Sequence, residues 1–101
     1  MKSARLISML ALAAISLPAA AQTAGQWQKP EHIWRAVCSY CHGANVAAEL
    51  RGRGLPVELI FTIVRQGVPG MPVFHPSEIS DDELADLSIW LSSSAAPGTK
   101  P

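Results

Sequence analysis

An all-α fold of one small domain is predicted by three features of the 101-residue sequence. Three segments carry apolar side chains at the three- and four-residue spacing of an amphipathic helix. No segment shows the apolar–polar alternation of a half-buried strand. Two long stretches rich in glycine and proline separate the three segments. We therefore expect three main helices joined by two long loops.

Residues 1–21 are predicted to be a signal peptide outside this domain. Lys2 and Arg5 form a basic start, an apolar run spans Leu6 to Leu17, and Ala19 and Ala21 have the A-x-A spacing of a cleavage site. The run is too short to cross a bilayer comfortably, so cleavage is favoured over the alternative of an uncleaved anchor. This pattern predicts export to the periplasm, with no membrane span left after processing.

The predicted mature chain is residues 22–101, with an ordered core over about 29–93. Without Lys2 and Arg5 it keeps 6 basic residues against 8 acidic ones, a net charge of −2. Because no basic patch appears, nucleic acid is not an expected partner. A domain of this size buries a limited core and needs an additional stabilising group.

The first helix is expected from Pro30, suited to a first helical position, to about Tyr40. Its apolar stripe comprises Ile33, Trp34, Val37 and Cys38. His32 is expected to be a solvated residue of the first turn. An irregular loop over residues 43–55 follows, because several glycines interrupt any regular pattern there.

The second helix is expected to start at Pro56 and to end at Gly67. Its predicted apolar face comprises Leu59, Ile60, Ile63 and Val64. A loop follows in which residues 67–76 contain three prolines and two glycines.

A third helix is expected after Ser80, which forms a capping-box pattern with Glu83. Its core stripe comprises Leu84, Leu87, Trp90 and Leu91, and residues 92–101 are expected to be a frayed tail. Trp34 and Trp90 are expected to meet where the terminal helices cross. Trp27, before the first helix, is given no role beyond covering apolar surface.

Residues Cys38-Ser39-Tyr40-Cys41-His42 match the C-x-x-C-H signature of covalent haem attachment. The two thiols can form thioethers with the vinyl groups on one porphyrin edge, and the next residue then lies beneath the iron. His42 would supply a neutral imidazole nitrogen to that iron. A redox C-x-x-C is disfavoured because it belongs in a βαβ context. A zinc site is disfavoured because no second ligand pair has suitable spacing.

Met71 is the expected second iron ligand. It is the only methionine left after removal of the signal peptide, and it lies 29 positions after His42. A methionine often only fills a core gap, but Gly70 and Pro72 make a rigid loop that presents one side chain. His75 is the rival ligand, with a surface histidine as its simpler interpretation.

Arg51 and Arg53 flank Gly52 in the first loop. Both can be solvated arginines, or they can bond a haem propionate or a partner's carboxylate. The propionate role is favoured for Arg53.

With C-x-x-C-H, a lone loop methionine and aromatic residues on the terminal helices, the chain resembles the class I c-type cytochromes, which have a small all-α fold around one haem. Within them it is similar to the cytochrome subunits of p-cresol methylhydroxylase (4-cresol dehydrogenase) and related 4-alkylphenol and eugenol hydroxylases. The segments that carry this narrower resemblance are Leu50–Pro56, Ile63–Gly67, Met71–Phe74 and Trp90–Ser93.

The resemblance implies an electron-transfer subunit that is not an enzyme by itself. In that family a flavoprotein subunit with covalent FAD oxidises a 4-alkylphenol, and the cytochrome passes the electrons to an external acceptor. The family assembly is two flavoproteins with two cytochromes. The remaining alternatives are a free diffusible monohaem cytochrome and a haem sensor or peroxidase-like enzyme, and the loop methionine argues against the last.

The resemblance also implies that Leu50 packs on the haem. Many relatives have Gly-Pro before this leucine, and the carbonyl of that proline orients the haem-ligating histidine. Ala47-Ala48 stands in its place here, in a loop that looks shortened. We therefore expect a different carbonyl to orient His42.

Overall fold

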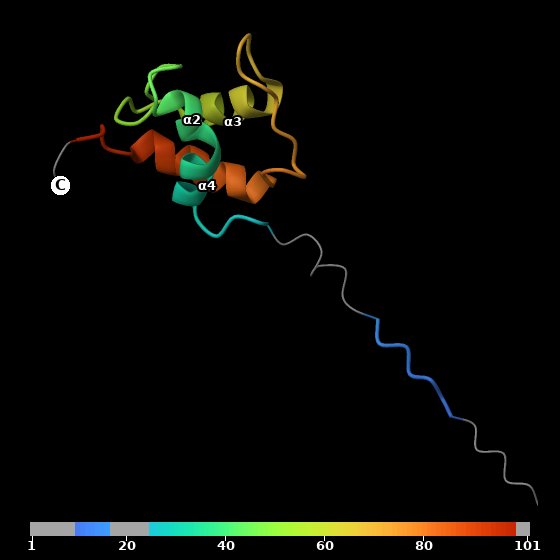
Figure 1. Cartoon of the computed structure of the whole chain (residues 1–101). Coiled ribbons are helices and arrows are strands. Elements are labelled where there is room, and N and C mark those ends of the chain that lie inside the picture. The colour runs from blue at the N-terminus through green and yellow to red at the C-terminus, as the bar shows by residue number, and fades with distance from the viewer. Residues whose placement is uncertain (1–9, 17–24, 99–101) are drawn as a thin grey trace, which may run out of the picture.

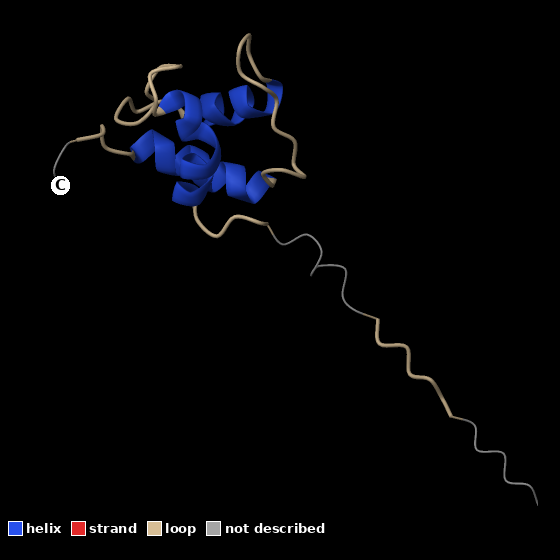
Figure 2. Cartoon of the chain, viewed as in Figure 1, coloured by secondary structure: helices blue, strands red, loops and turns tan. Residues whose placement is uncertain are grey.

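The computed structural model describes residues 10–16 and 25–98, and its helices lie in the second range (Figure 1). They are α1 (Pro30–Ile33), the π-helical η2 (Trp34–Cys38), α2 (Ser39–His42), α3 (Val57–Gln66) and α4 (Asp81–Ser93). Within the described ranges the chain forms no strand, only an isolated bridge between Val68 and Met71 (Figure 2). The prediction of an all-α fold is confirmed.

The elements α1, η2 and α2 follow one another directly and form one helix, which ends at His42 rather than at the predicted Tyr40. In its π turn the Ser39 N–H donates to the carbonyl of Trp34, five residues earlier. A π turn adds one residue to the helix and so rotates everything after it. Within this helix Cys38 is half-buried, while Cys41 is exposed.

Helix α3 packs on α4 through Ile60 and Val64, one helical turn apart. The prediction that Leu59 lies on this buried face is wrong, since Leu59 is 45% exposed. Successive residues differ by about 100° around a helix, so Leu59 lies at the margin of the face that Ile60 centres. Gly67 ends the helix with φ of 71°, a conformation that glycine adopts without steric cost.

The capping box of α4 is confirmed. The Glu83 N–H donates to Ser80 Oγ at 3.2 Å, and the Ser80 N–H donates to Glu83 Oε1 at 2.9 Å. The other carboxylate oxygen of Glu83 accepts from the Trp27 N–H at 2.7 Å. Burial raises the pKa of Glu83, but these hydrogen bonds outweigh it and the net pKa is lowered. The cap therefore also fixes the chain that precedes the first helix.

The segment after α4 is held against the first loop. The helix continues to Ser93, and the carbonyl of Ser94 accepts from the Gly52 N–H at 3.0 Å. A Cβ at Gly52 would lie 2.6 Å from the backbone of Ala96. The prediction that the chain frays from residue 92 is therefore wrong for its first residues, because a loop distant in sequence contacts them.

The core lies where α4 contacts both the first helix and α3. Its buried hydrophobic residues are Ile33, Trp34, Ile60, Val64, Ile79, Leu84, Leu87 and Leu91. The ring centroids of Trp34 and Trp90 lie 6.1 Å apart with an interplanar angle of 49°, a tilted arrangement favourable for aromatic pairs. The predicted contact between these two residues is confirmed.

Replacing Leu84 with alanine is expected to lower the free energy of unfolding by about 2–5 kcal/mol, because this fully buried side chain would leave a cavity. Ile89→Ala on the same helix is the control: Ile89 is 56% exposed, so its loss is expected to change stability by about 0.5 kcal/mol or less. Urea unfolding of both variants measures the difference. Equal effects would contradict the placement of Leu84 at the core.

Residues 10–16 are exposed and have no regular secondary structure. The predicted cleavage site, between Ala21 and Gln22, lies outside the described residues. In the part of the chain that is described, no helix is long and apolar enough to span a membrane.

Candidate functional site

The two cysteines of the C-x-x-C-H motif lie on the first helix and are not joined by a disulfide. Burial raises the pKa of the Cys38 thiol to about 11, so this thiol is protonated at neutral pH. A redox C-x-x-C pair depends on a cysteine whose pKa is lowered, which is the opposite situation. No group of three or more metal-ligating side chains occurs among the described residues, which also gives no support to a zinc site.

The imidazole of His42 is oriented by the backbone of the following loop. Its Nδ1 lies 2.8 Å from the carbonyl oxygen of Ala48. Because a carbonyl only accepts hydrogen bonds, Nδ1 carries the proton and donates. Nε2 then keeps its lone pair, which is the tautomer that a metal ion requires. Ala48 stands where many relatives have proline, so the expectation that a different carbonyl orients His42 is wrong.

A tight turn after the helix brings Ala48 back to His42. Asn45 adopts φ of 60°, a left-handed conformation that asparagine tolerates better than most residues. The Ala47 N–H donates to the carbonyl of Cys41 at 3.0 Å and closes the turn. The loop therefore returns to the helix within six residues and places the Ala48 carbonyl next to His42 without a proline.

Glu49, next to Ala48, is fixed by Arg51. The guanidinium of Arg51 donates to both carboxylate oxygens at 2.8 and 3.1 Å and lies 4.9 Å from the ring centroid of Trp34. These contacts anchor the segment that carries the Ala48 carbonyl to the core. Arg51 is thus engaged within the chain rather than freely solvated.

The Arg51 side chain, through its hydrogen bonds, lowers the pKa of Glu49 from 4.5 to about 2. A lowered folded-state pKa adds stability above the unfolded pKa, and this stability is lost as the pH falls from about 4.5 to about 2. Both side chains are about one-third exposed, so their ion pair is screened by solvent. We therefore expect Glu49→Gln to lower the free energy of unfolding at pH 7 by at most about 1 kcal/mol. The difference from wild type, measured by denaturant unfolding, is expected to vanish towards pH 2. A difference independent of pH would contradict the ion pair.

Met71 ends a tight turn in the second loop. Its N–H donates to the carbonyl of Val68 at 2.9 Å, and Gly70 has φ of 86°. Proline at the second position and glycine at the third are typical of a type II turn. The Met71 side chain is half-buried and packs against the core cluster, as Cys38 and Leu50 also do. The structure therefore brings these three predicted site residues to one apolar cluster.

The two remaining site candidates are exposed, and two residues that were given no site role are half-buried. Arg53 is exposed on the first loop, and His75, the rival to Met71, is exposed four residues after it. His32 is half-buried in the first helical turn. Trp27 packs against the core, and its indole N–H donates to the Glu78 carbonyl at 3.0 Å.

Comparisons with known proteins show the class to which this fold and motif belong. The family model described as cytochrome c oxidase, cbb3-type, subunit III matches residues 25–91, more than half of the chain. The chain therefore belongs to the c-type cytochrome family and is an electron-transfer protein, and this family implies haem c as its redox group.

Within this class the chain is similar to the cytochrome c subunit of 4-cresol dehydrogenase (hydroxylating) from Pseudomonas putida. The two are 39% identical over 83 residues, which cover 80% of this chain and 74% of the relative. A crystal structure of p-cresol methylhydroxylase with substrate bound matches with a TM-score of 0.65 and 38% identity, over 70% of this chain and 99% of that chain. A second one, at 2.5 Å resolution, matches with a TM-score of 0.63 and 38% identity, over 68% and 97%.

Two residues near the site could not be identified from their residue types, although the resemblance marks the position of Ala48. Ala48 acts through its backbone carbonyl, which leaves no trace in residue type. Arg65 bonds the second loop from α3, and its residue type gives no signal, because it shares the polar side of the helix with Glu58 and Thr62.

Proposed function

We propose that this chain is the haem-bearing electron-transfer subunit of a periplasmic flavocytochrome. The observation that carries the proposal is the hydrogen bond from His42 Nδ1 to the Ala48 carbonyl at 2.8 Å, which leaves Nε2 available to iron. The donor chemistry of the site fits one covalent haem c. Two unpaired thiols stand at the attachment spacing, one imidazole follows them, and one thioether lies on a loop against the same core.

In this proposal Cys38 and Cys41 form the thioethers, and His42 and Met71 are the iron ligands. Leu50, half-buried on the core, packs on the haem, and the exposed Arg53 bonds a propionate. The bound haem supplies a one-electron redox centre. The thioether of Met71 is a soft, neutral donor, so it favours ferrous over ferric iron and raises the reduction potential. That is suitable for a chain that accepts electrons from a reduced flavin.

The partner follows from the relatives. We propose a flavoprotein subunit that carries FAD, oxidises a 4-alkylphenol-type substrate and delivers electrons to this chain one at a time, in an assembly of two flavoproteins and two cytochromes. The cytochrome then passes them to an external acceptor protein and performs no substrate chemistry itself. Similarity to a cytochrome subunit over 80% of the chain supports this role.

The test is purification of the native protein from its own periplasm at moderate salt. We expect a flavoprotein to be isolated with it, and addition of a 4-alkylphenol to reduce the haem of the complex. Isolation of a monomeric cytochrome without flavin, at several salt concentrations, would instead favour a free diffusible carrier. Signal-peptide cleavage is tested by the same sample, whose first residue is expected to be Gln22.

Association with the flavoprotein is expected to depend weakly on salt. The two loops expose small and apolar residues, namely Ala44, Val46, Pro69, Gly70 and Val73, with Ala47 half-buried beside them. Docking through such a surface relies on burial rather than on charge steering. Between low and physiological ionic strength the dissociation constant should change by less than about threefold. A steep loss of affinity with added salt would favour a charge-steered carrier.

A further inference from the structure

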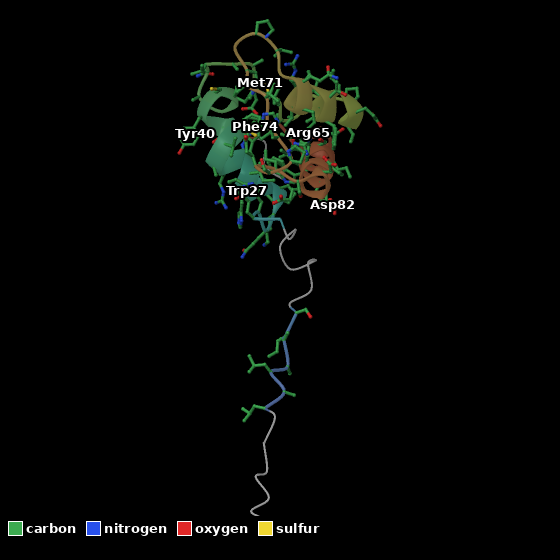
Figure 3. The ribbon with its side chains drawn as sticks, turned by 90° about the vertical axis from the view of Figure 1, so that its right-hand side faces the viewer. Trp27, Tyr40, Arg65, Met71, Phe74 and Asp82 are labelled. Atoms are coloured by element: carbon green, nitrogen blue, oxygen red, sulfur yellow. The ribbon has the colours of Figure 1, made fainter. Side chains whose placement is uncertain are left out.

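Arg65 lies in the last turn of α3. Its guanidinium forms hydrogen bonds with the part of the second loop that follows Met71 (Figure 3). One nitrogen donates to the carbonyl of Phe74 at 3.1 Å, and another donates to the carbonyl of Ile79 at 2.9 Å. The second nitrogen also donates to Asp81 Oδ1 at 2.7 Å and forms an ion pair with it. The side chain of Arg65 is only 16% exposed, so these bonds are largely shielded from water.

Phe74 is thereby fixed through both its backbone N–H and its backbone carbonyl. Its N–H donates to the carbonyl of Val64 at 3.0 Å, while its carbonyl accepts from Arg65. The Phe74 ring packs against the core, and the guanidinium lies 5.5 Å from the ring centroid of Phe61. Phe74 follows Met71 by three residues, so this attachment limits where the Met71 sulfur can lie.

The first part of the loop, residues 67–71, is fixed independently of Arg65. Gly67 allows the chain to fold back on α3, since a Cβ there would lie 3.0 Å from Val73 and 3.1 Å from the Met71 carbonyl. The turn from Val68 to Met71 closes with its own hydrogen bond. The remaining stretch contains prolines that donate no backbone hydrogen bond. The planar fork of Arg65 supplies the donors that a helix or sheet would otherwise provide.

We infer that Arg65 is the positioning residue that holds Met71 in place as an iron ligand. This inference rests on the proposed role of Met71. Without the guanidinium, the carbonyls of Phe74 and Ile79 lose a charged donor, and the loop is freed to move away from the core. The Asp81 carboxylate is 72% exposed, so its ion pair contributes little, and the two bonds to carbonyls carry the effect.

The experiment compares Arg65→Gln with Arg35→Gln, both as the mature holoprotein. Arg35 is exposed on the first helix, so its replacement removes the same charge without touching the loop. The readouts are the near-infrared band of a sulfur–iron bond in the ferric protein, carbon monoxide binding to the ferrous protein, and hydrogen exchange of the Phe74 amide.

For Arg65→Gln we expect retained covalent haem, a weakened sulfur–iron band, faster exchange at Phe74 and carbon monoxide affinity raised by about tenfold. For Arg35→Gln we expect no change. In a Met71→Ala, His75→Ala background, where the loop offers no iron ligand, Arg65→Gln should no longer alter carbon monoxide affinity, because its effect acts through the ligand position. If Arg65→Gln still changes carbon monoxide affinity in that background, the effect is a general loss of stability, and the inference is overturned.

An Arg65→Gln protein that matches Arg35→Gln in all three readouts would overturn the inference while the ligation by Met71 stands. A wild-type protein without the sulfur–iron band would overturn Met71 ligation itself, and the positioning role with it. If Arg65→Gln does not accumulate with haem, Arg65→Lys decides. Its single ammonium cannot reproduce the fork, so carbon monoxide affinity should still rise, and a wild-type value would overturn the inference.

Discussion

A chain with both Cys38 and Cys41 replaced by alanine is expected to lose covalent haem and most of its helical structure. Only eight hydrophobic residues are buried in the described part of the chain, and two long loops separate its three main helices. A domain this small buries too little apolar surface to offset the entropy of ordering its loops. Far-ultraviolet circular dichroism should show the loss, together with haem that is extracted by acidified acetone.

The control for this experiment is Tyr40→Phe, a change inside the same motif. Tyr40 is 73% exposed, so removal of its hydroxyl should leave attachment and helix content unchanged. A double cysteine variant that keeps native-like helices would contradict the view that covalent haem is required for folding. A variant whose helices are lost but whose haem stays covalently bound would contradict the assignment of the cysteines.

Met71→Ala is expected to open the sixth position of the iron, with a large rise in carbon monoxide binding. The alternative outcome is recruitment of His75, the nitrogen donor four residues further along the same loop. The double variant Met71→Ala, His75→Ala should remove that outcome and bind carbon monoxide. Met71→His should lower the reduction potential, because a nitrogen donor favours ferrous iron less than a thioether does.

Val73→Ala is the control for the loop, since Val73 is 41% exposed and two residues from Met71. It should leave the spectrum and the potential close to wild type. If Met71→Ala has the spectrum and potential of the wild-type protein, Met71 is not a ligand.

The sequence predicted those features that depend on local pattern. The capping box of Ser80 and Glu83 and the glycine at the end of α3 follow from residue types at local spacing. The contact of Trp34 with Trp90 was predicted from the apolar stripes of two helices expected to cross. Leu59 was misplaced because the width of a buried face depends on the helix packed against it. The π turn was missed because its effect is a change of register, which residue types do not encode.

In the candidate site, too, some residues could be predicted from the sequence and others could not. The motif residues and Met71 could be found from the sequence because their chemistry requires particular side chains. The groups that orient them could not, because Ala48 acts through its backbone and Arg65 reaches carbonyls up to fourteen positions away. Such contacts exist only after the loops are folded onto the helices.

The most direct test of the central claim is the intact mass of the mature protein under denaturing conditions, followed by mass analysis of its proteolytic peptides. We expect the polypeptide from Gln22 plus one haem, with the added mass on the peptide that contains Cys38 and Cys41. A mass equal to the polypeptide alone, or a peptide with a Cys38–Cys41 disulfide, would contradict the assignment of a covalent haem to this site.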